Sequence, residues 1–521
     1  MRSIRALGLS LAAVLLLLLA GALAQLGPDA QRGREIYKRG TAPDSEEIIA
    51  VISGSGTRIP AAAMPCESCH GIEGVSSVQG SLSPSDISWP ALTRPMQSEK
   101  RSRPAYDEAK LRRSITLGYD SAGNELSASM PRYLFTRKDL DDLVEYMKTL
   151  GTGQEPGLSH EAIALATLLP AQGRLAEQGT AVEAALRAGL QEINQGGGVA
   201  GRRLKLQVVE APLDPSQRLE AMRALLQDGS VFALVSPFFI GAEELMSGLA
   251  EEFGVPVIAP MTLRPRLGDP VNPYVFYLQA GLQDQCRAMI RFASSAAGSN
   301  QPQVSVLVSS DGRFDRAAQA VEAQAAALGW PAPRRAVCPP QGCHQAIFES
   351  LRKAESDILV VLLPAPQVRP TLRQADQAGW RPRVFLPSLL FSAALFGAPG
   401  DFTGRLFVSY PVLPPDLPPK GRDRMRQMAL SEDLAEDYRL LQAGVLGAVE
   451  VLAEGLRRAG REVGQRRLVL QLQTLQGYAT GFTRPVTYSP YRRVGILGAH
   501  VVPVDLAGSR LELPGVWVEL N

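Results

Sequence analysis

The sequence predicts a multidomain protein in which a small all-α domain is followed by a larger α/β domain of two lobes. Three observations support this prediction. Residues 25–152 carry helix-type patterns at both ends and one C-x-x-C-H motif between them. Residues 159–521 open with short apolar runs that alternate with longer helical patterns. Between the two regions, residues 153–158 contain glycine and proline and are typical of a linker.

Composition and charge limit the function classes. The chain has 521 residues, of which 45% are hydrophobic and 20% are charged, as in ordinary globular proteins of two or three domains. The formal net charge is +2 and the basic residues are scattered, so we expect no nucleic acid as a partner. The four histidines are too few to suggest a histidine-rich metal site.

The first 24 residues have the pattern of a secretory signal peptide. Two arginines precede an apolar run, residues 7–19, which is too short to span a bilayer comfortably. The A-x-A pattern at residues 22–24 predicts cleavage before Gln25, with an uncleaved anchor helix as the alternative. We therefore expect a periplasmic protein that has no membrane span after cleavage.

The motif in the first domain consists of Cys66, Cys69 and His70. In an exported chain this spacing is the signature of c-type haem attachment. Both thiols can add to vinyl groups on one edge of the porphyrin, and the histidine then reaches the iron. A zinc site would need a second pair of ligands, and a thioredoxin-like pair would follow a strand instead of a proline-bearing loop. We expect one covalent haem c.

Helical patterns flank this motif. Asp29 can cap a short helix that carries Ile36 and Tyr37 on its apolar side. Residues 136–139 resemble a capping box, and apolar residues recur at helical spacing through residue 150. Two such helices can pack together and close a small domain around a flat cofactor, which also adds apolar surface to a small core.

A haem iron needs a sixth ligand or remains open. His70 is the only histidine of this region, so methionine is the candidate ligand. Met130 lies in a loop directly before a proline, which restricts the backbone. Met96 lies in a proline-rich loop and stays an alternative, and Met130 could instead fill the core. Met64 is too close to the attachment loop, and Met147 falls on the buried side of the last helix.

The order GREIY, CESCHG, ITLGYDSAGNELSASMPRY and LDDLVEYMKTL resembles a class I cytochrome c over about residues 29–150. The resemblance implies Cys66 and Cys69 as thioether anchors, His70 as proximal ligand and Met130 as distal ligand. A His/Met pair implies a fairly high potential and electron transfer. The stretch between the motif and residue 111 is longer and richer in proline than in compact members.

From residue 159 the pattern changes. Short apolar runs that alternate with helices predict parallel βαβ units covered on both faces, and two successive series predict two doubly wound lobes. Ligands of such folds bind at the carboxyl ends of the strands, here between the lobes. We expect strands near residues 162–170, 204–211, 231–238, 255–260, 304–310, 357–366 and 383–387.

The phrases GLQEINQGGGVAGRRLKLQVVEAPLDP and VPVIAPMTLRPRL resemble periplasmic type I solute-binding proteins of the branched-chain amino-acid receptor kind. Pro237 lacks a backbone N–H, and the loop LPSLLFSA has no acid, so we expect a small, largely apolar ligand instead of a free amino acid. The aromatic residues involved could equally form a buried lobe interface. The resemblance places the ligand near Ser236, Phe238, Met261, Thr262 and Phe314.

The remaining cysteines suit an oxidising compartment. Cys338 and Cys343 flank a turn-like stretch and predict a disulfide, with a second haem site of widened spacing at His344 as the alternative. Cys286 falls on a predicted helix, where we expect a buried free thiol.

These features together predict an exported c-type cytochrome with a periplasmic redox partner protein and a module that docks the protein or senses a small ligand. An alternative is an ABC-transporter-type solute receptor in which the haem is secondary. A haem peroxidase would need an open iron site and a second haem or distal base. No catalytic motif occurs, so we do not expect an enzyme.

Overall fold

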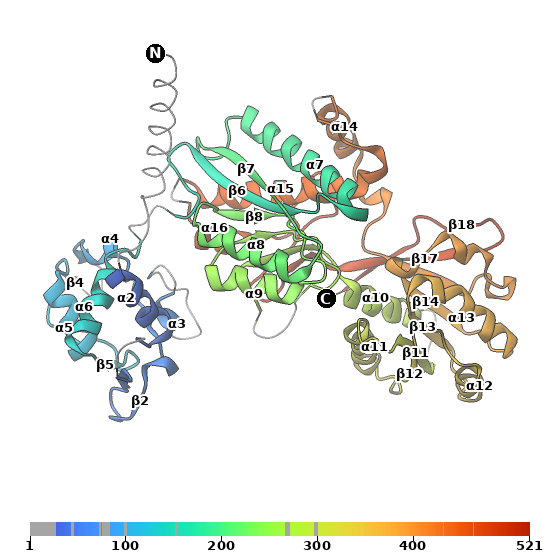
Figure 1. Ribbon diagram of the computed structural model, residues 1–521, viewed down its shortest axis with the longest axis horizontal. Coiled ribbons are helices and arrows are strands. Elements are labelled where there is room, and N and C mark those ends of the chain that lie inside the picture. The colour runs from blue at the N-terminus through green and yellow to red at the C-terminus, as the bar shows by residue number, and fades with distance from the viewer. Residues whose placement is uncertain are drawn as a thin grey trace, which may run out of the picture. The chain divides into compact units, whose positions relative to one another are not determined.

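The computed structural model describes residues 28–42, 46–71, 74, 84–97, 102–151, 155–265, 271–295, 301–430, 432–461 and 463–520. The chain forms two compact units with the boundary between Gln154 and Glu155 (Figure 1, where the first unit is blue to cyan). The predicted signal peptide, residues 1–24, lies outside the described residues.

Two terminal helices organise the first unit. The terminal pair consists of α2 (Pro28–Arg39) and α6 (Arg137–Met147). Between them lie α3 (Cys66–His70), α4 (Trp89–Leu92) and α5 (Glu108–Leu117). Thr136 caps α6 by accepting the N–H of Asp139, as the capping-box pattern predicts. Helices α2 and α6 pack so closely that a Cβ at Gly33 would lie 1.9 Å from the Asp142 carbonyl oxygen. The predicted pairing of the terminal helices is therefore confirmed.

The all-α prediction for this unit needs a correction, because short strands are also present. Strand β1 (Ile49–Val51) lies between β2 (Arg58–Pro60) and β5 (Arg132–Leu134), and both pairs are antiparallel. A separate hairpin joins β3 (Met96–Gln97) to β4 (Ser102–Arg103). Strands of two or three residues are too short to show a period-2 pattern, so the sequence alone does not reveal them.

The second unit contains the predicted lobes, and its first sheet is parallel throughout. The strand order is β16-β10-β9-β8-β6-β7. These strands are β6 (Ala162–Leu169), β7 (Arg203–Glu210), β8 (Ala233–Val235), β9 (Val257–Ile258), β10 (Val275–Gln279) and β16 (Val494–Ile496). The order and direction confirm the predicted βαβ architecture.

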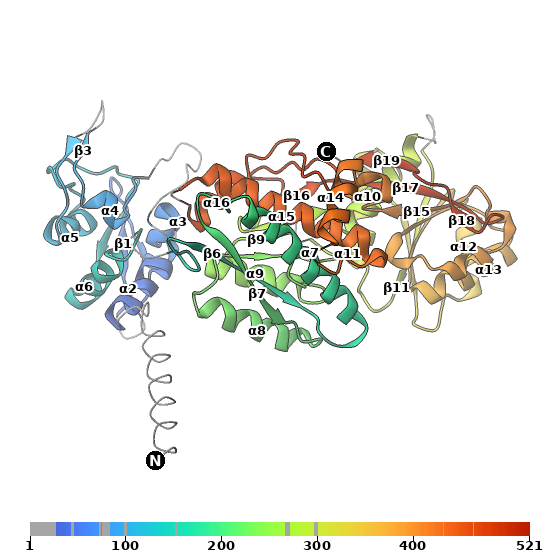
Figure 2. The same cartoon turned by 90° about the horizontal axis from the view of Figure 1, so that it is seen from above.

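Helices cover both faces of this first sheet. One face packs on α7 (Ala176–Gln195), α15 (Arg439–Ala459) and α16 (Gln465–Leu472), and α7 and α15 lie side by side (Figures 1 and 2). The other face packs on α8 (Pro215–Gln227) and α9 (Glu243–Phe253). Asp214 caps α8 by accepting the N–H groups of Ser216 and Gln217, and the proline that follows Asp214 suits the first helical position.

The second sheet has the order β12-β11-β13-β14-β15-β17-β18, with β19 also paired to β17. Its strands are β11 (Val304–Ser309), β12 (Arg334–Cys338), β13 (Ile358–Leu362), β14 (Arg383–Pro387), β15 (Leu406–Tyr410), β17 (Gly498–Asp505), β18 (Arg510–Leu511) and β19 (Val516–Glu519). The first five are parallel, and β17 runs antiparallel to β15. The helices around it are α10 (Leu282–Ser295), α11 (Asp315–Ala327), α12 (Gln345–Lys353) and α13 (Ala365–Gln377).

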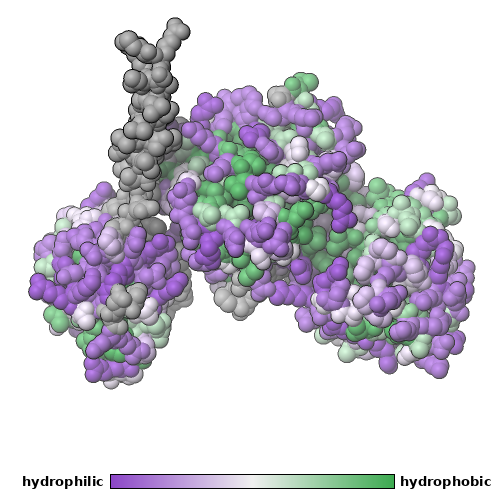
Figure 3. All heavy atoms as spheres, viewed as in Figure 1, coloured by the Kyte–Doolittle hydropathy of each residue, from purple (hydrophilic) through white to green (hydrophobic). Residues whose placement is uncertain are grey.

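The chain passes between the two sheets three times: after β10, between β15 and α14 (Pro419–Met428), and between β16 and β17. Three connections therefore join the lobes into one unit. Figure 3 shows polar residues over most of the viewed face of this unit, with hydrophobic residues gathered toward its middle.

Part of the predicted linker belongs to the second unit. The Gln465 N–H donates to the Glu155 carboxylate at 3.1 Å, and the Ala164 N–H donates to the Gly157 carbonyl at 2.7 Å. Residues 155–158 are therefore held by the second unit and do not act as a free tether. None of the described helices is both long and apolar enough to cross a membrane.

Candidate functional site

Helix α3 brings the three residues of the C-x-x-C-H motif together on one turn. Pro65 precedes the helix in an extended conformation. Gly71 ends it with a φ of 71°, and its N–H donates to the Glu67 carbonyl. A positive φ at this position favours glycine, so the residue after His70 also defines where the helix stops.

Both thiols of α3 are unbridged. Cys66 and Cys69 are partly exposed as whole residues, but Cys66 packs against the apolar core of the unit. Its thiol lies among apolar groups, and this burial raises the pKa of Cys66 to about 12. Two free thiols on one turn beside an apolar wall are the donor set that covalent attachment of a flat, apolar macrocycle requires, so the residues present fit a haem.

The His70 ring is oriented by a backbone carbonyl. Its Nδ1 lies 3.0 Å from the Ser85 carbonyl oxygen. Burial lowers the pKa of His70, although the bond to Ser85 acts in the opposite direction. The imidazole is therefore neutral near pH 7, donates from Nδ1, and leaves the Nε2 lone pair for a metal. Sequence reasoning missed Ser85, because a carbonyl carries no side-chain signal.

Two tyrosines tie the attachment turn to the rest of the unit. The Tyr37 hydroxyl on α2 donates to the Gly71 carbonyl, and the Tyr133 hydroxyl on β5 donates to the Met64 carbonyl, both at 2.6 Å. Burial raises the pKa of Tyr133, and the nearby cysteines act in the same direction. The two hydroxyls thus hold the residues on either side of the C-x-x-C-H turn.

Met130 lies two residues before β5, the strand whose Tyr133 contacts the residue before the attachment turn's proline. Met130 is partly buried, as is the alternative ligand Met96 on β3, whereas Met147 is buried in the core as predicted. Met130 as the sixth ligand stays a prediction.

Several apolar side chains pack, like Cys66, against the core of the unit and are only partly buried. They leave apolar surface that a cofactor could cover: Ile59, Ile87, Trp89, Tyr106 and Phe135. An apolar, water-poor surrounding stabilises the ferrous state of a haem relative to the ferric state.

In the second unit, the predicted ligand residues separate into two groups. Ser236, Phe238 and Phe314 are buried, and the Phe238 ring lies under the Arg218 guanidinium at 4.6 Å. Met261, together with the adjacent threonine at position 262, is partly exposed. The two phenylalanines occupy lobe cores, which is the alternative that the sequence left open.

Neighbouring loops at the carboxyl ends of the first sheet are joined by hydrogen bonds. The Phe239 N–H donates to the Met261 carbonyl at 3.0 Å, and the Met261 N–H donates to the Pro237 carbonyl at 2.8 Å. Ser236 and Ala259, which follow β8 and β9, have φ values of 49° and 52°. Such left-handed backbone costs about 1–3 kcal/mol per residue and concentrates at ligand sites.

Two buried carboxylates also follow strands of this sheet, and sequence reasoning missed them. Glu243 begins α9 and Asp284 lies in the first turn of α10. One oxygen of each has no hydrogen-bond partner among the described residues. Burial raises the pKa of Asp284, and the nearby Arg287 offsets this only in part. Each lies in the first turn of the helix that follows a strand, and an acidic residue at such a position is the signal that could have found them.

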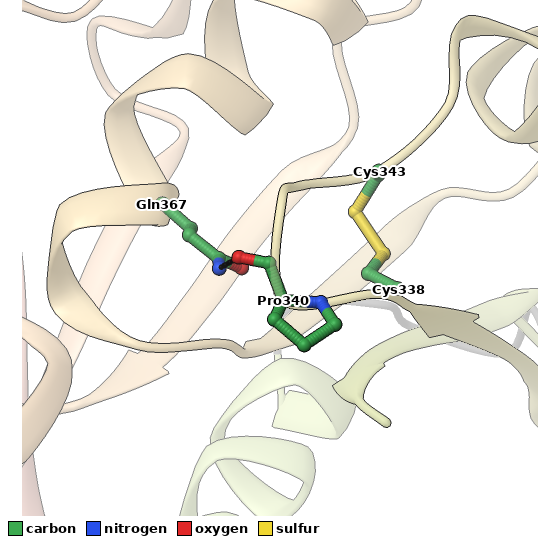
Figure 4. The surroundings of a disulfide bond; sticks show 4 residues. All are labelled: Cys338, Pro340, Cys343 and Gln367. Carbon is green, nitrogen blue, oxygen red and sulfur yellow. Dashed lines mark hydrogen bonds between the residues drawn. A yellow bond between two sulfur atoms is a disulfide. The ribbon is translucent and has the colours of Figure 1, made fainter. Parts of the chain in front are cut away.

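The structure contains the predicted Cys338–Cys343 disulfide (Figure 4). The two Cα atoms lie 4.6 Å apart, and both residues are buried. Gln367 of α13 donates to the Pro340 carbonyl at 2.5 Å and holds the enclosed turn from outside. Cys286 is a free, buried thiol on α10, as expected, and burial raises its pKa.

Comparisons with known families agree with this division of the chain. The model of the periplasmic binding protein family matches residues 162–508, and the model of the cytochrome c family matches residues 59–151. A cytochrome c domain implies a covalently bound haem, and both families are typically exported to the periplasm.

One curated relative is the Leu/Ile/Val-binding protein BraC3 of Rhizobium johnstonii, which is 28% identical over 110 residues. That match spans 21% of this chain and only 30% of the relative's length.

Solved structures share the fold of the second unit. A Rhodospirillum rubrum protein described as a branched-chain amino acid ABC transporter is 18% identical, with a TM-score of 0.54 over 67% of this chain and 99% of that protein. A branched-chain amino acid ABC transporter protein from Thermus thermophilus with bound valine is 15% identical, with a TM-score of 0.53 over 70% and 98%. A fatty acid ABC transporter substrate-binding protein from Thermomonospora curvata is 15% identical, with a TM-score of 0.52 over 71% and 95%. The chain therefore belongs to the periplasmic binding protein family and carries a cytochrome c domain ahead of its binding-protein region.

Proposed function

We propose that the protein is an exported electron carrier that exchanges single electrons with a periplasmic redox partner protein. One observation carries this proposal: two unbridged thiols and a histidine share one helical turn, and the first of the thiols packs against the apolar core of the unit. A haem c held there supplies one-electron chemistry between its ferrous and ferric states.

The residues of the first unit have separate roles in this proposal. Cys66 and Cys69 anchor the haem, His70 is the proximal ligand and Met130 the distal ligand. Ser85 fixes the tautomer and direction of the imidazole through its carbonyl. A thioether is a weak donor that favours the ferrous state, so we expect a fairly high potential.

For the second unit we propose the binding of one small, largely apolar ligand at the carboxyl ends of the strands. The partly exposed Met261 and Thr262 and the strained backbone at Ser236 and Ala259 support this location. The names of the relatives, which mention leucine, isoleucine, valine and fatty acid, suggest aliphatic compounds. The buried oxygens of Glu243 and Asp284 would supply polar contacts at the edge of such a ligand.

A solute receptor of the ABC-transporter type, in which the haem is secondary, is the second candidate, and the family of the larger unit favours it. We propose that the protein is not an enzyme. A haem peroxidase would need an open iron site, and a methionine ligand would close that site.

A visible and near-infrared spectrum with a stepwise redox titration tests the proposal. We expect one haem per chain, a sulfur-to-iron band at the red edge of the spectrum, and reversible one-electron titration at a fairly high potential. An open five-coordinate iron that turns over peroxide would overturn the electron-carrier proposal. Thermal shift measurements with valine, leucine, a medium-chain fatty acid and an aromatic acid test the ligand class separately.

A further inference from the structure

We infer that Arg132 is a positioning residue that holds the methionine loop, residues 118–131, against the haem iron and thereby sets the strength of the Met130–iron bond. The inference rests on the proposed function, because it takes Met130 as the distal ligand. It goes further by naming the group that keeps this weak ligand in place.

The Arg132 guanidinium binds two carbonyls of the loop at once. Nη1 donates to the Met130 carbonyl at 2.5 Å, and Nη2 donates to the Leu126 carbonyl at 3.3 Å. The planar fork of arginine fixes both donors relative to each other, which a lysine ammonium cannot do. The backbone of Arg132 is itself fixed, because β5 pairs with β1 in the register Val51–Arg132.

The arginine also spans the loop from one end to the other. A Cβ at Gly118, where the loop begins, would lie 1.7 Å from Nε of Arg132, so the guanidinium passes directly over this glycine. The Leu126 N–H donates to the Gly118 carbonyl at 2.8 Å. Arg132 therefore contacts the start, the middle and the methionine of the loop.

The two halves of the loop differ in how well they are held. The first half has several bonds of its own: Arg113 donates to the Asp120 carbonyl at 2.8 Å, and the Asp120 carboxylate accepts the N–H groups of Ala122 and Asn124 at 2.9 Å each. In the second half, the Met130 N–H donates to the Ser127 carbonyl at 3.0 Å within a single turn. The Met130 carbonyl accepts a hydrogen bond from Arg132, a residue of the sheet.

This difference has a chemical consequence for the ligand. A thioether bonds weakly to iron. The bond therefore persists only if the loop is already ordered, so that little conformational entropy is lost when the sulfur binds. Loss of the guanidinium leaves the Met130 and Leu126 carbonyls without a charged donor. We expect the loop to open more often and external ligands to compete better for the iron.

Arg103 offers a matched control within the same unit. It also donates to backbone carbonyls, including those of Ala91 at 3.0 Å and Arg94 at 3.2 Å. It lies on β4 opposite Met96 in the β3–β4 hairpin. Arg103 thus donates to backbone carbonyls that precede the alternative ligand Met96, as Arg132 donates to carbonyls of the methionine loop.

The experiment uses the full-length, haem-loaded protein and the variants Arg132→Gln, Arg132→Lys, Arg103→Gln and Met130→Ala. Three properties are measured: the sulfur-to-iron band, the redox potential, and the affinity of the ferric iron for imidazole. For Arg132→Gln we expect a weaker band, a lower potential and imidazole binding that is tighter by about tenfold or more. Arg132→Lys should lie between Arg132→Gln and the wild type, and Arg103→Gln should match the wild type.

Other outcomes separate the failure of this inference from that of the proposed function. If Met130→Ala removes the band while Arg132→Gln and Arg132→Lys behave as wild type, Met130 is the ligand but the role of Arg132 is wrong. If Arg103→Gln changes all three properties as much as Arg132→Gln does, the effect is not specific and the inference also fails. If Met130→Ala keeps the band, the ligand assignment is overturned together with the role of Arg132. Should Arg132→Gln not load haem, Arg132→Lys decides the question by the same three measurements.

Discussion

His500 Nε2 lies 2.7 Å from the Asp416 carboxylate, and both side chains are buried although they are 84 residues apart in the chain. Asp416 belongs to the connection between β15 and α14, and His500 lies on β17. Asp416 also accepts from Arg484 at 3.1 Å, and the Arg484 guanidinium lies 4.0 Å from the centre of the Trp517 ring. This cluster joins one of the three connections between the lobes to β17 of the second sheet and to the segment between α16 and β16.

The first prediction concerns acid stability. Burial by itself would raise the pKa of Asp416, but hydrogen bonds from His500 and the Leu413 N–H, with Arg484 adding to them, hold this pKa below its usual value. The carboxylate therefore stabilises the fold above the pKa of an unfolded aspartate, about 3.9, and this contribution is lost as the pH falls through the lower folded value. Asp416→Asn should lower the free energy of unfolding by about 3 kcal/mol at pH 7 and flatten its acid dependence.

Urea unfolding of the wild type and Asp416→Asn between pH 7 and strongly acidic conditions measures this effect. Asp423→Asn, on the exposed surface of α14, is a suitable control. Equal acid dependence of the wild type and Asp416→Asn would contradict the prediction.

The second prediction concerns the number of haems. Replacing either Cys66 or Cys69 by alanine should remove one of the two thioether bonds, and replacing both should abolish covalent attachment. Cys338→Ser with Cys343→Ser should leave one haem per chain and cost about 2 kcal/mol of stability, because the loop that the disulfide closes is short. A pyridine haemochrome assay counts the haems, and two per chain in the wild type would refute the single-haem proposal.

The third prediction concerns which of the predicted ligand residues of the second unit stabilise the core and which contact the ligand. Phe238→Ala should destabilise the protein by about 3–5 kcal/mol, because it empties core space under Arg218. Met261→Ala should cost less, because Met261 is only partly buried, but should weaken ligand binding. Thermal unfolding and calorimetric titration with the compound that gives the largest thermal shift distinguish the two effects. A ligand that binds Met261→Ala as it binds the wild type would place the site elsewhere.

The fourth prediction concerns communication between the units. The boundary lies between Gln154 and Glu155, and Glu155 is held by the second unit, so the haem domain remains tethered within tens of ångströms by chain length alone. We expect a bound ligand to change the rate of haem reduction by a redox partner in the intact chain. Regulation of this kind requires the ligand to favour one arrangement energetically. Stopped-flow reduction of the intact chain and of residues 25–154 alone, each with and without ligand, provides the test. Identical rates in all four measurements would show that the second unit does not regulate the haem.

Sequence reasoning could predict those features that depend on neighbouring residues. Cys66, Cys69 and His70 share one helical turn, so their convergence needs no distant contact. Strands such as β6, β11 and β13 are long enough to show their apolar runs, and the shorter β8 and β9 lie within apolar runs that extend beyond their paired residues. The alternation of these runs with helices implies the parallel order found in the first sheet and in the first five strands of the second. The pair Cys338 and Cys343 is close in the chain, so its disulfide could be predicted in the same way.

Tertiary structure decided the features that join residues far apart in the chain. The Ser85 carbonyl orients His70, Tyr133 reaches back 69 residues to Met64, and Phe238 turns into the core under Arg218. No local period encodes these contacts, because they follow from how separate elements pack. The sequence by itself therefore determined the two-part division of the chain, the α/β class of the second unit and the haem-attachment triad. Packing decided how the proximal ligand is oriented and which predicted aromatic residues fill the core, because burial of apolar surface and pairing of backbone groups are properties of the whole fold.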